Sequence, residues 1–297
     1  MIRNRRRRDT ECKPRREPTT EIPIIPSKSR GQNFLTQAAI ADRIVALAEL
    51  KPDDCVVEIG PGLGILTERI TAQPVGRVTL IELDREICTR LRRQFASNPH
   101  VNLIEADFLR VDFDEIAHDG PLKIIGNLPF NVASAIFRVL CEHSNQIALA
   151  VLMFQREVAE RIRAEPGSSD YGALSVFAKI YFEIDRHFRV SAGSFHPRPK
   201  VDAEVLRLRP LATRQFDDRE EDLVLRCVRA AFHASRKMLR NSLAVGLGID
   251  NASAERILVD AGIDPTARAE SLCVADFVRL ARSLAGSGLA GNGLRRG

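Results

Sequence analysis

A glycine-rich segment between a short apolar run and a helical pattern is the first part of the sequence that could bind a ligand. It reads Glu58-Ile59-Gly60-Pro61-Gly62-Leu63-Gly64. Glycines at alternate positions let the main chain approach a ligand closely, and free amides at the start of the following helix favour an anion. A dinucleotide site needs G-x-G-x-x-G, whereas here the third glycine comes one residue early and Ile65 follows it. This spacing argues against a pyrophosphate ligand.

Two carboxylates follow the next two predicted strands. Glu82 ends one strand, at a distance from Gly60 where a carboxylate can accept hydrogen bonds from both hydroxyls of a ribose. Asp107 lies just past the following strand, where it could receive an exocyclic adenine amine. Each feature also has an ordinary structural interpretation, as a turn, a solvated strand end or a cap. In this order they predict a site for S-adenosylmethionine, a nucleoside that carries a carboxylate and no phosphate.

The tetrapeptide Asn127-Leu128-Pro129-Phe130 follows a further strand, at the sheet edge where open α/β folds bind ligands. The side-chain oxygen of Asn127 and a nearby carbonyl could accept both hydrogens of an adenine N6 amine. These bonds would turn the nitrogen lone pair out of the ring system, towards a methyl donor. Phe130 would stack on a base removed from its helix. The alternative is a plain β-to-α turn, with Phe130 packed in the core.

The elements that must position these residues alternate between strands and helices. We predict strands at 55–59, 78–82, 101–105, 122–126 and 147–153, and helices at 38–50, 85–95 and 133–141. This alternation indicates an α/β, Rossmann-like fold with a mostly parallel sheet. Two further apolar runs, 173–182 and 201–208, are expected to add a hairpin-like pair of strands, which gives seven in all.

The rest of the chain is predicted to be helical. From Arg219 onward the apolar spacing indicates a helix over about 221–243, a glycine break at 246–248 and two shorter helices. Basic residues recur at steps of three and four on the first of these helices: Arg226, Arg229, His233, Arg236 and Arg240. This stripe could contact RNA, although a solvated helix face has the same composition. We expect a basic disordered tail at 1–27, a catalytic domain at 28–210, a helical domain at 211–285 and a flexible end at 286–297.

Composition and charge narrow the class of protein. The 297 residues carry a net charge of +5, but the first 30 hold ten basic and four acidic side chains, so the remainder is nearly neutral. No apolar run reaches the length of a membrane span, and the acidic residues near the start disfavour a targeting sequence, so we expect a cytoplasmic protein. The six cysteines are scattered, and His187 and His196 lack partners at ligand spacing. Neither a metal site nor a disulfide framework is expected.

Several segments from Lys28 to Leu284 resemble the ribosomal RNA adenine dimethyltransferase family, in particular its bacterial 16S rRNA branch. In the catalytic part they are Gly31-Gln32-Asn33-Phe34-Leu35, Glu58 to Gly64, Ile81 to Asp84, Asn127 to Phe130, Gln155-Arg156-Glu157-Val158 and Phe195-His196-Pro197-Arg198-Pro199-Lys200-Val201-Asp202. In the helical part they are Arg236-Lys237-Met238-Leu239-Arg240-Asn241-Ser242-Leu243 and Gly262 to Glu270. The chain departs from this branch at Phe130, where tyrosine is more frequent, and at Arg30, where an apolar residue is usual. Tyr171 lies in a segment that resembles a family loop near the substrate, but the sequence assigns it no role.

The resemblance implies a class I methyltransferase that uses S-adenosylmethionine to dimethylate two adjacent adenosines of 16S rRNA in the immature small subunit, as a monomer. It implies a cofactor site formed by Gln32, Asn33, Leu35, Gly60, Gly62, Glu82, Asp107 and Asn127. The catalytic residues would be Asn127, Leu128, Pro129, Phe130 and Phe195, with the two phenylalanines on either side of the target adenine. RNA would be bound by Arg226, Arg229, Arg236, Lys237 and Arg240. A 23S rRNA methyltransferase and a non-catalytic ribosome-assembly factor are the alternatives.

Overall fold

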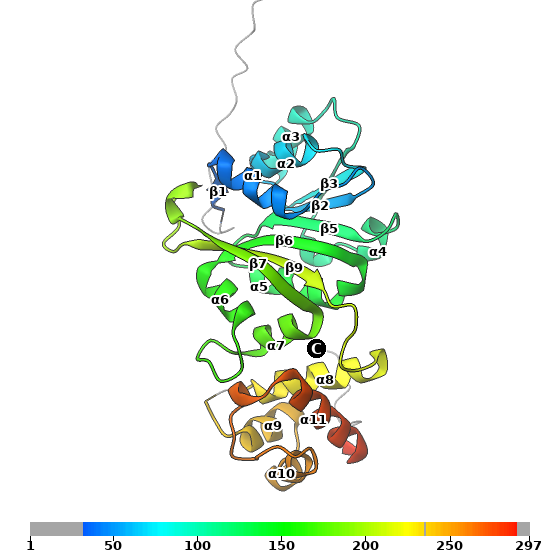
Figure 1. Ribbon diagram of the computed structural model, residues 1–297, viewed down its shortest axis with the longest axis vertical. Coiled ribbons are helices and arrows are strands. Elements are labelled where there is room, and N and C mark those ends of the chain that lie inside the picture. The colour runs from blue at the N-terminus through cyan, green and yellow to red at the C-terminus, as the bar shows by residue number, and fades with distance from the viewer. Residues whose placement is uncertain (1–31, 235, 290–297) are drawn as a thin grey trace, which may run out of the picture.

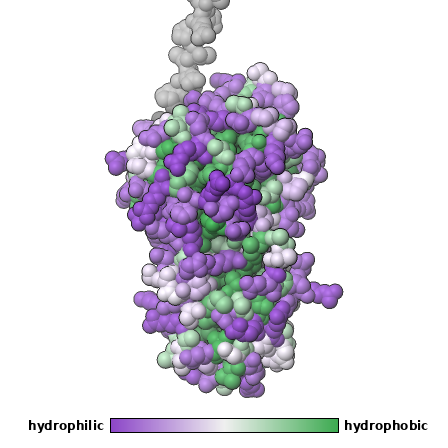
Figure 2. All heavy atoms as spheres, in the orientation of Figure 1, coloured by the Kyte–Doolittle hydropathy of each residue, from purple (hydrophilic) through white to green (hydrophobic). Residues whose placement is uncertain are grey.

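The computed structural model describes residues 32–234 and 236–289 (Figure 1). The predicted tail at 1–27, Arg30, Gly31 at the start of the first family segment, and residues 290–297 lie outside these ranges. A layered α/β part forms the upper half of the molecule in Figure 1, and four helices form the lower half. Hydrophilic side chains dominate the upper half of the face in Figure 2, and more apolar ones appear on the lower half.

A seven-stranded sheet forms the centre of the α/β part, in the order β4-β3-β2-β5-β6-β9-β7. Its strands are β2 (Cys55–Ile59), β3 (Arg77–Glu82), β4 (Val101–Glu105), β5 (Leu122–Asn127), β6 (Ile147–Gln155), β7 (Phe182–Val190) and β9 (Ala203–Pro210). The first five run parallel, and β9 pairs antiparallel with both β6 and β7. The predicted Rossmann-like, mostly parallel fold is confirmed.

Helices cover both faces of this sheet. One layer holds α1 (Ala38–Leu47), α2 (Ile65–Thr71) and α3 (Arg85–Gln94); the other holds α4 (Phe113–Ile116), α5 (Ala133–Glu142), α6 (Arg156–Arg163) and α7 (Ala173–Tyr181). Successive strand residues supply opposite faces, so Val56 belongs to the apolar core under α1 and Val57 to the core under α5. A separate short ladder pairs β1 (Phe34–Leu35) with β8 (Phe195–His196).

One predicted strand is a helix. The run at 173–182 forms α7, and the strand beside β9 is the next segment, β7. Helix α7 lies between α5, α6 and the C-terminal helices, and six of its nine residues are buried. When nearly every side of an element is apolar, the spacing of its apolar residues cannot distinguish a helix from a strand. Strand β7 looks polar in the sequence because it is the edge strand, with exposed charges along much of its length.

Four helices form what we call the helical bundle: α8 (Asp218–Ala231), α9 (Leu239–Leu247), α10 (Asn251–Asp260) and α11 (Val274–Gly286). The predicted single helix over 221–243 is wrong, because the chain turns between α8 and α9. The turn is fixed by tertiary bonds: the Leu239 amide donates to the Ala267 carbonyl at 2.7 Å, and the Arg240 amide to the Pro265 carbonyl at 3.2 Å. No helix among the described residues is long and apolar enough to cross a membrane.

The glycine break predicted at 246–248 is correct only in part. Gly248 follows α9 with a φ of 68°, a left-handed conformation that suits glycine at a helix end. Gly246 lies inside α9, where a Cβ atom would approach the Cα of Ala230 on α8 to 2.5 Å. Its role is therefore to let two helices pack closely, which sequence spacing could not reveal.

Candidate functional site

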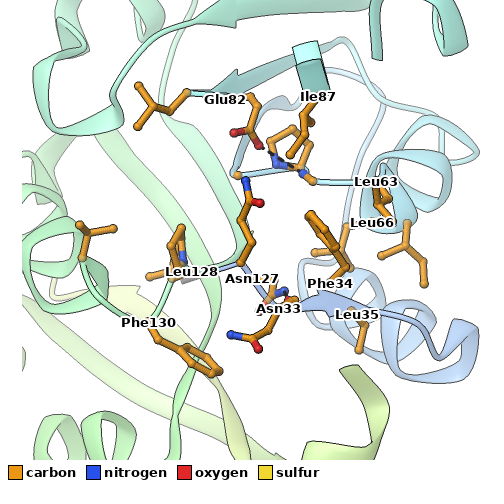
Figure 3. Close-up of a pocket in the computed structure, with 18 of the residues that line it drawn as sticks. Asn33, Phe34, Leu35, Leu63, Leu66, Glu82, Ile87, Asn127, Leu128 and Phe130 are labelled. Carbon is orange, nitrogen blue, oxygen red and sulfur yellow. Dashed lines mark hydrogen bonds between the residues drawn. The ribbon is translucent and has the colours of Figure 1, made fainter. Parts of the chain in front are cut away.

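A cavity of about 220 Å³ opens at the edge of the sheet where β2, β3 and β5 end (Figure 3). All the residues predicted for the cofactor line it: Gln32, Asn33, Leu35, Gly60, Gly62, Glu82, Asp107 and Asn127. Leu128, Pro129 and Phe130 line it as well. In Figure 3, Glu82 lies at one end of the cavity and Phe130 at the other, with Asn127 between them. Segments separated by almost 100 residues thus meet in one site.

The glycine loop forms one wall of the cavity. The Gly60 amide donates to the Ile81 carbonyl at 2.9 Å, and the Gly64 amide to the Pro61 carbonyl at 3.0 Å. Gly62 has a φ of 55°, and a Cβ there would lie 2.9 Å from the ring of Phe34. The absence of a side chain at Gly62 therefore lets the loop and the β1 segment close together around the cavity.

Glu82 ends β3, and its side chain is buried. One carboxylate oxygen accepts the Asp84 amide at 2.9 Å, and the other accepts the Gly62 amide over a longer 3.4 Å. Burial raises the pKa of Glu82, and these backbone bonds oppose the rise. A buried carboxylate with few partners is suited to accept hydroxyl donors from a ligand, so Glu82 fits the ribose of S-adenosylmethionine.

Asp107 has the capping role that the sequence offered as one alternative, and it also lies at the cavity, where the other alternative places it. One of its oxygens accepts the Leu109 amide at 3.0 Å and so caps the short helix η2 (Phe108–Arg110). Its side chain also lines the cavity. The cap holds the carboxylate in place at the rim, and this arrangement is compatible with a bond from an adenine amine.

Several apolar lining residues were missed in the sequence. Leu83 lines the cavity with 59% of its surface exposed, and Phe34, Leu63 and Ile87 line the same space. An exposed leucine beside Glu82 offers an apolar surface to a flat ring. Leu83 lies in the family segment that starts at Ile81, and this was the one sign in the sequence that it could belong to the site. The cavity therefore combines apolar walls with a few fixed polar groups, as small-molecule sites do.

Glu58 is a further residue that the sequence did not single out. It is fully buried in β2, and its Oε2 accepts the Thr67 hydroxyl at 2.6 Å. Burial is the main cause that raises its pKa to about 8, and the nearby charge of Glu82 adds to the rise. With this raised pKa the Glu58 carboxyl keeps its proton at neutral pH, and of these two carboxyl groups only that of Glu82 lines the cavity.

Asn127 is the last residue of β5, and its side chain is held in one orientation. Its Nδ2 donates to the main-chain oxygen of Asn33 at 3.0 Å. The Leu128 amide donates to the Met153 carbonyl at 3.1 Å, which fixes the turn that follows. With the amide nitrogen engaged, the Oδ1 atom is the part of Asn127 left to accept a ligand donor. Phe130 is half-buried at the nearby end of the cavity.

Phe195 lies elsewhere than the other predicted catalytic residues. It pairs with Leu35 in the β1–β8 ladder, is only 4% exposed and packs in the core on the α1 side of the sheet. It is not among the residues that line the cavity. Its place beside Phe130 around an adenine stays a prediction.

The predicted basic stripe is divided by the turn between α8 and α9. Arg226 and Arg229 are on α8, whereas the exposed Arg236 and Lys237 are on the connection. Arg240 is in α9 and forms an ion pair with Glu255 at 2.8 Å. A single continuous stripe is therefore wrong. Of the predicted RNA-binding set, the exposed members are Arg229, Arg236 and Lys237.

Solved structures share this architecture. A dimethyladenosine transferase from Plasmodium falciparum superposes with a TM-score of 0.70 at 24% identity, covering 86% of this chain and 98% of that one. The 23S rRNA methyltransferase ErmE gives a TM-score of 0.62 at 28% identity, covering 85% of this chain and 100% of that one. The sheet order and the cavity at its carboxyl edge define a class I S-adenosylmethionine-dependent methyltransferase.

Residues 27–286 match the family described as ribosomal RNA adenine dimethylase, and the chain belongs to that family. A relative from Syntrophotalea carbinolica, ribosomal RNA small subunit methyltransferase A, is 43% identical over 258 residues, which is 86% of this chain and 96% of the relative. A Moorella thermoacetica protein of the same name is 41% identical over 270 residues, 88% of this chain and 93% of that protein. The chain is an enzyme that methylates ribosomal RNA.

Proposed function

We propose that this enzyme transfers methyl groups from S-adenosylmethionine to N6 of two adjacent adenosines in the 3′-terminal hairpin of 16S rRNA. The product is N6,N6-dimethyladenosine, and the substrate is the immature small ribosomal subunit in the cytoplasm. The names of the relatives from Syntrophotalea and Moorella support the small subunit as the target. The enzyme acts as a monomer and contributes to small-subunit biogenesis.

The orientation of Asn127 is the observation that carries this proposal. The bond from its Nδ2 to the Asn33 carbonyl leaves Oδ1 to accept one hydrogen of the adenine N6 amine. A main-chain carbonyl of the 127–130 segment accepts the second hydrogen. The nitrogen lone pair is then released from the ring and directed along the cavity. S-adenosylmethionine supplies an activated methyl group on a sulfonium.

Proton transfer needs no strong base at this site. The methylated amine is acidic enough to lose its proton to water, and no histidine lines the cavity among the described residues. Phe130 stacks on the extruded base and keeps its N6 beside Asn127. The protein contributes mainly position and fixed hydrogen-bond acceptors, which are worth most in a partly desolvated cavity.

The helical bundle is proposed to be an RNA-binding domain that begins near residue 211. Arg236 and Lys237 would neutralise phosphates, so changing both to Ala should reduce the slope of log affinity against log salt by about one to two. The matched control changes Lys51 and Arg93 to Ala, which are exposed cations of the α/β part. An equal change of slope in both pairs would exclude a specific role for the bundle.

The function is tested by incubating the full chain with labelled S-adenosylmethionine and either immature small subunits or free large-subunit RNA. We expect dimethyladenosine, identified by mass spectrometry, in the small-subunit reaction alone. Label only in the large-subunit RNA would favour the 23S rRNA methyltransferase alternative. Binding to the small subunit without label would favour an assembly factor.

A further inference from the structure

The chain has two tyrosines, and both lie where the helical bundle meets the α/β part. Tyr171 comes two residues before α7, and Tyr181 is its last residue. Helix α7 packs against α5 and α6 on one side, and against α8 and α11 of the bundle on the other. Figure 1 shows α7 between the sheet and the bundle. The two phenol groups therefore mark opposite ends of the helix that joins the two halves.

Tyr171 reaches across the junction at the first end. Its hydroxyl donates to the main-chain oxygen of Leu272 at 2.8 Å, and only 5% of the residue is exposed. Its ring meets Phe232, just after α8, edge-on at 6.1 Å. A second bond reinforces this end, because the Gly167 amide donates to the Glu270 carbonyl at 2.7 Å. The loop before α7 is thus attached to the bundle through main-chain atoms of the segment before α11.

Tyr181 makes the corresponding bond at the second end. Its hydroxyl donates to Oε1 of Glu221 on α8 at 2.5 Å. The other oxygen of Glu221 pairs with Arg214 at 2.8 Å, and the Leu211 amide donates to the Tyr181 carbonyl at 2.9 Å. Burial raises the pKa of both phenols, so both hydroxyls remain donors throughout the physiological range. The connection from β9 to α8 is held by the same group of residues.

These bonds depend on orientation in a way that apolar packing does not. A rotation of the bundle would leave the buried Leu272 carbonyl without a donor, and an unpaired buried acceptor is costly. The same rotation would separate the Tyr181 hydroxyl from Glu221, whose other oxygen is paired with Arg214. One apolar core runs from the sheet through α7 into the bundle and holds the two halves together, but apolar contacts have no preferred direction. The two phenol bonds add the directional contacts at this junction. Helix α6, which precedes the Tyr171 loop, starts where β6 ends at the cavity edge of the sheet.

We propose that Tyr171 and Tyr181 are positioning residues that hold the helical bundle at a fixed orientation relative to the Asn127–Phe130 segment, and so select which adenosines of a large RNA reach it. The inference rests on the proposed function, in which the bundle binds RNA. Arg236 and Lys237 would then bind the RNA at one place while the cavity receives the target adenosine at another, with a fixed distance between the two. A misplacement of about 1 Å can reduce a rate about a hundredfold.

The test compares Tyr171→Phe, Tyr181→Phe and the double variant on two acceptors. One acceptor is the immature small subunit, which can contact both halves of the enzyme, and the other is a short RNA hairpin that reaches the cavity alone. Ser175→Ala is the matched control, because its buried hydroxyl on α7 donates to the Arg161 carbonyl and accepts the Gly172 amide, and both bonds lie within the α/β part. Each tyrosine variant keeps the aromatic ring and loses only the hydroxyl, and Ser175→Ala likewise loses only a hydroxyl.

We expect the double variant to lose about tenfold in kcat/KM on the small subunit and to keep the wild-type value on the hairpin. It should also methylate additional adenosines, detected by mass spectrometry of digested RNA. Ser175→Ala should change both acceptors equally. Equal losses on both acceptors for the double variant, or no loss on either, would overturn the proposal.

A second measurement separates this inference from the proposed function. Hydrogen exchange of the Gly167 amide and small-angle scattering report the junction without any substrate. Faster exchange and a broader range of shapes in the double variant, but not in Ser175→Ala, would support orientation by the tyrosines even if the wild type failed to label small subunits. An unchanged scattering profile in the double variant would reject it.

Discussion

The side-chain nitrogen of Asn127 donates to the main-chain oxygen of Asn33 at 3.0 Å, and this bond joins the acceptor end of the cavity to the β1 segment. The two residues are 94 positions apart in the chain. The bond determines which end of the Asn127 amide faces the cavity. In the proposed function this bond couples the methyl-acceptor residue Asn127 to a segment of the cofactor site, since both residues line the same cavity.

Asn127→Ala should reduce kcat by about a hundredfold to a thousandfold, because a fixed hydrogen-bond partner of the reacting group is lost. Small-subunit affinity should remain near that of the wild type, since the bundle is unchanged. Asn127→Asp keeps an acceptor oxygen but loses the bond to Asn33, and it should also be impaired. Single-turnover methyl transfer measures both variants, with the exposed Asn102→Ala as control. Normal transfer by Asn127→Ala would contradict the acceptor assignment.

Cofactor affinity should depend on the ionisation of Glu82. Burial raises the pKa of Glu82 in the free protein, and hydroxyl donors from a ribose would favour the ionised form. Affinity is therefore expected to weaken as the pH falls through this raised pKa, at a higher pH than for an ordinary glutamate. Calorimetric titration with S-adenosylhomocysteine tests this, and Glu82→Gln should bind weakly with a flat profile. A flat profile in the wild type would exclude a role for Glu82 ionisation.

Glu58→Gln should change how stability depends on pH. The carboxyl titrates near 4.5 in the unfolded chain and near 8 in the folded protein. Between these values the unfolded chain releases the proton first, so the wild type loses stability as the pH rises and is level above about 8. The amide variant lacks this loss, which is at most about 5 kcal/mol because each pKa unit corresponds to about 1.4 kcal/mol.

Urea unfolding of both proteins at pH 5 and pH 8.5 measures the Glu58 effect, and their difference removes the contribution of other groups. The free energy of unfolding of Glu58→Gln, taken relative to that of the wild type, should be larger at pH 8.5 than at pH 5. A difference that is the same at both pH values would show that Glu58 titrates normally. Activity should be retained, because Thr67 can still donate to the amide oxygen.

Gly246→Ala should destabilise the helical bundle by about 1 to 3 kcal/mol, since its methyl group would overlap the Ala230 main chain. The control is Gly286→Ala at the end of α11, where nothing lies within 4 Å of an added Cβ. That change should be neutral or stabilising by up to about 1 kcal/mol. Chemical denaturation followed by circular dichroism compares the two. Similar stabilities would show that α8 and α9 can separate without cost.

Much of the catalytic half could be predicted from local sequence. Strands such as 55–59 and 101–105 are short apolar runs bounded by turn residues, and their predicted limits agree with the structure. The glycine loop and the 127–130 segment follow strands, so parallel topology alone was enough to place them at one edge. Local patterning succeeds there because each run is only five residues long and has turn residues before it, which favours a strand over a helix.

The tertiary structure decided the rest. Helix α7 is buried on nearly every side, so its sequence shows no helical spacing of apolar residues. The turn after α8 is fixed by bonds from residues 239 and 240 to the 265–267 segment. The orientation of Asn127 and the junction bonds of Tyr171 and Tyr181 join residues 40 to 101 positions apart. Sequence spacing specifies which groups are present at each sheet edge or helix face. Only the packing of distant elements determines which atoms meet, because those contacts depend on the three-dimensional path of the chain.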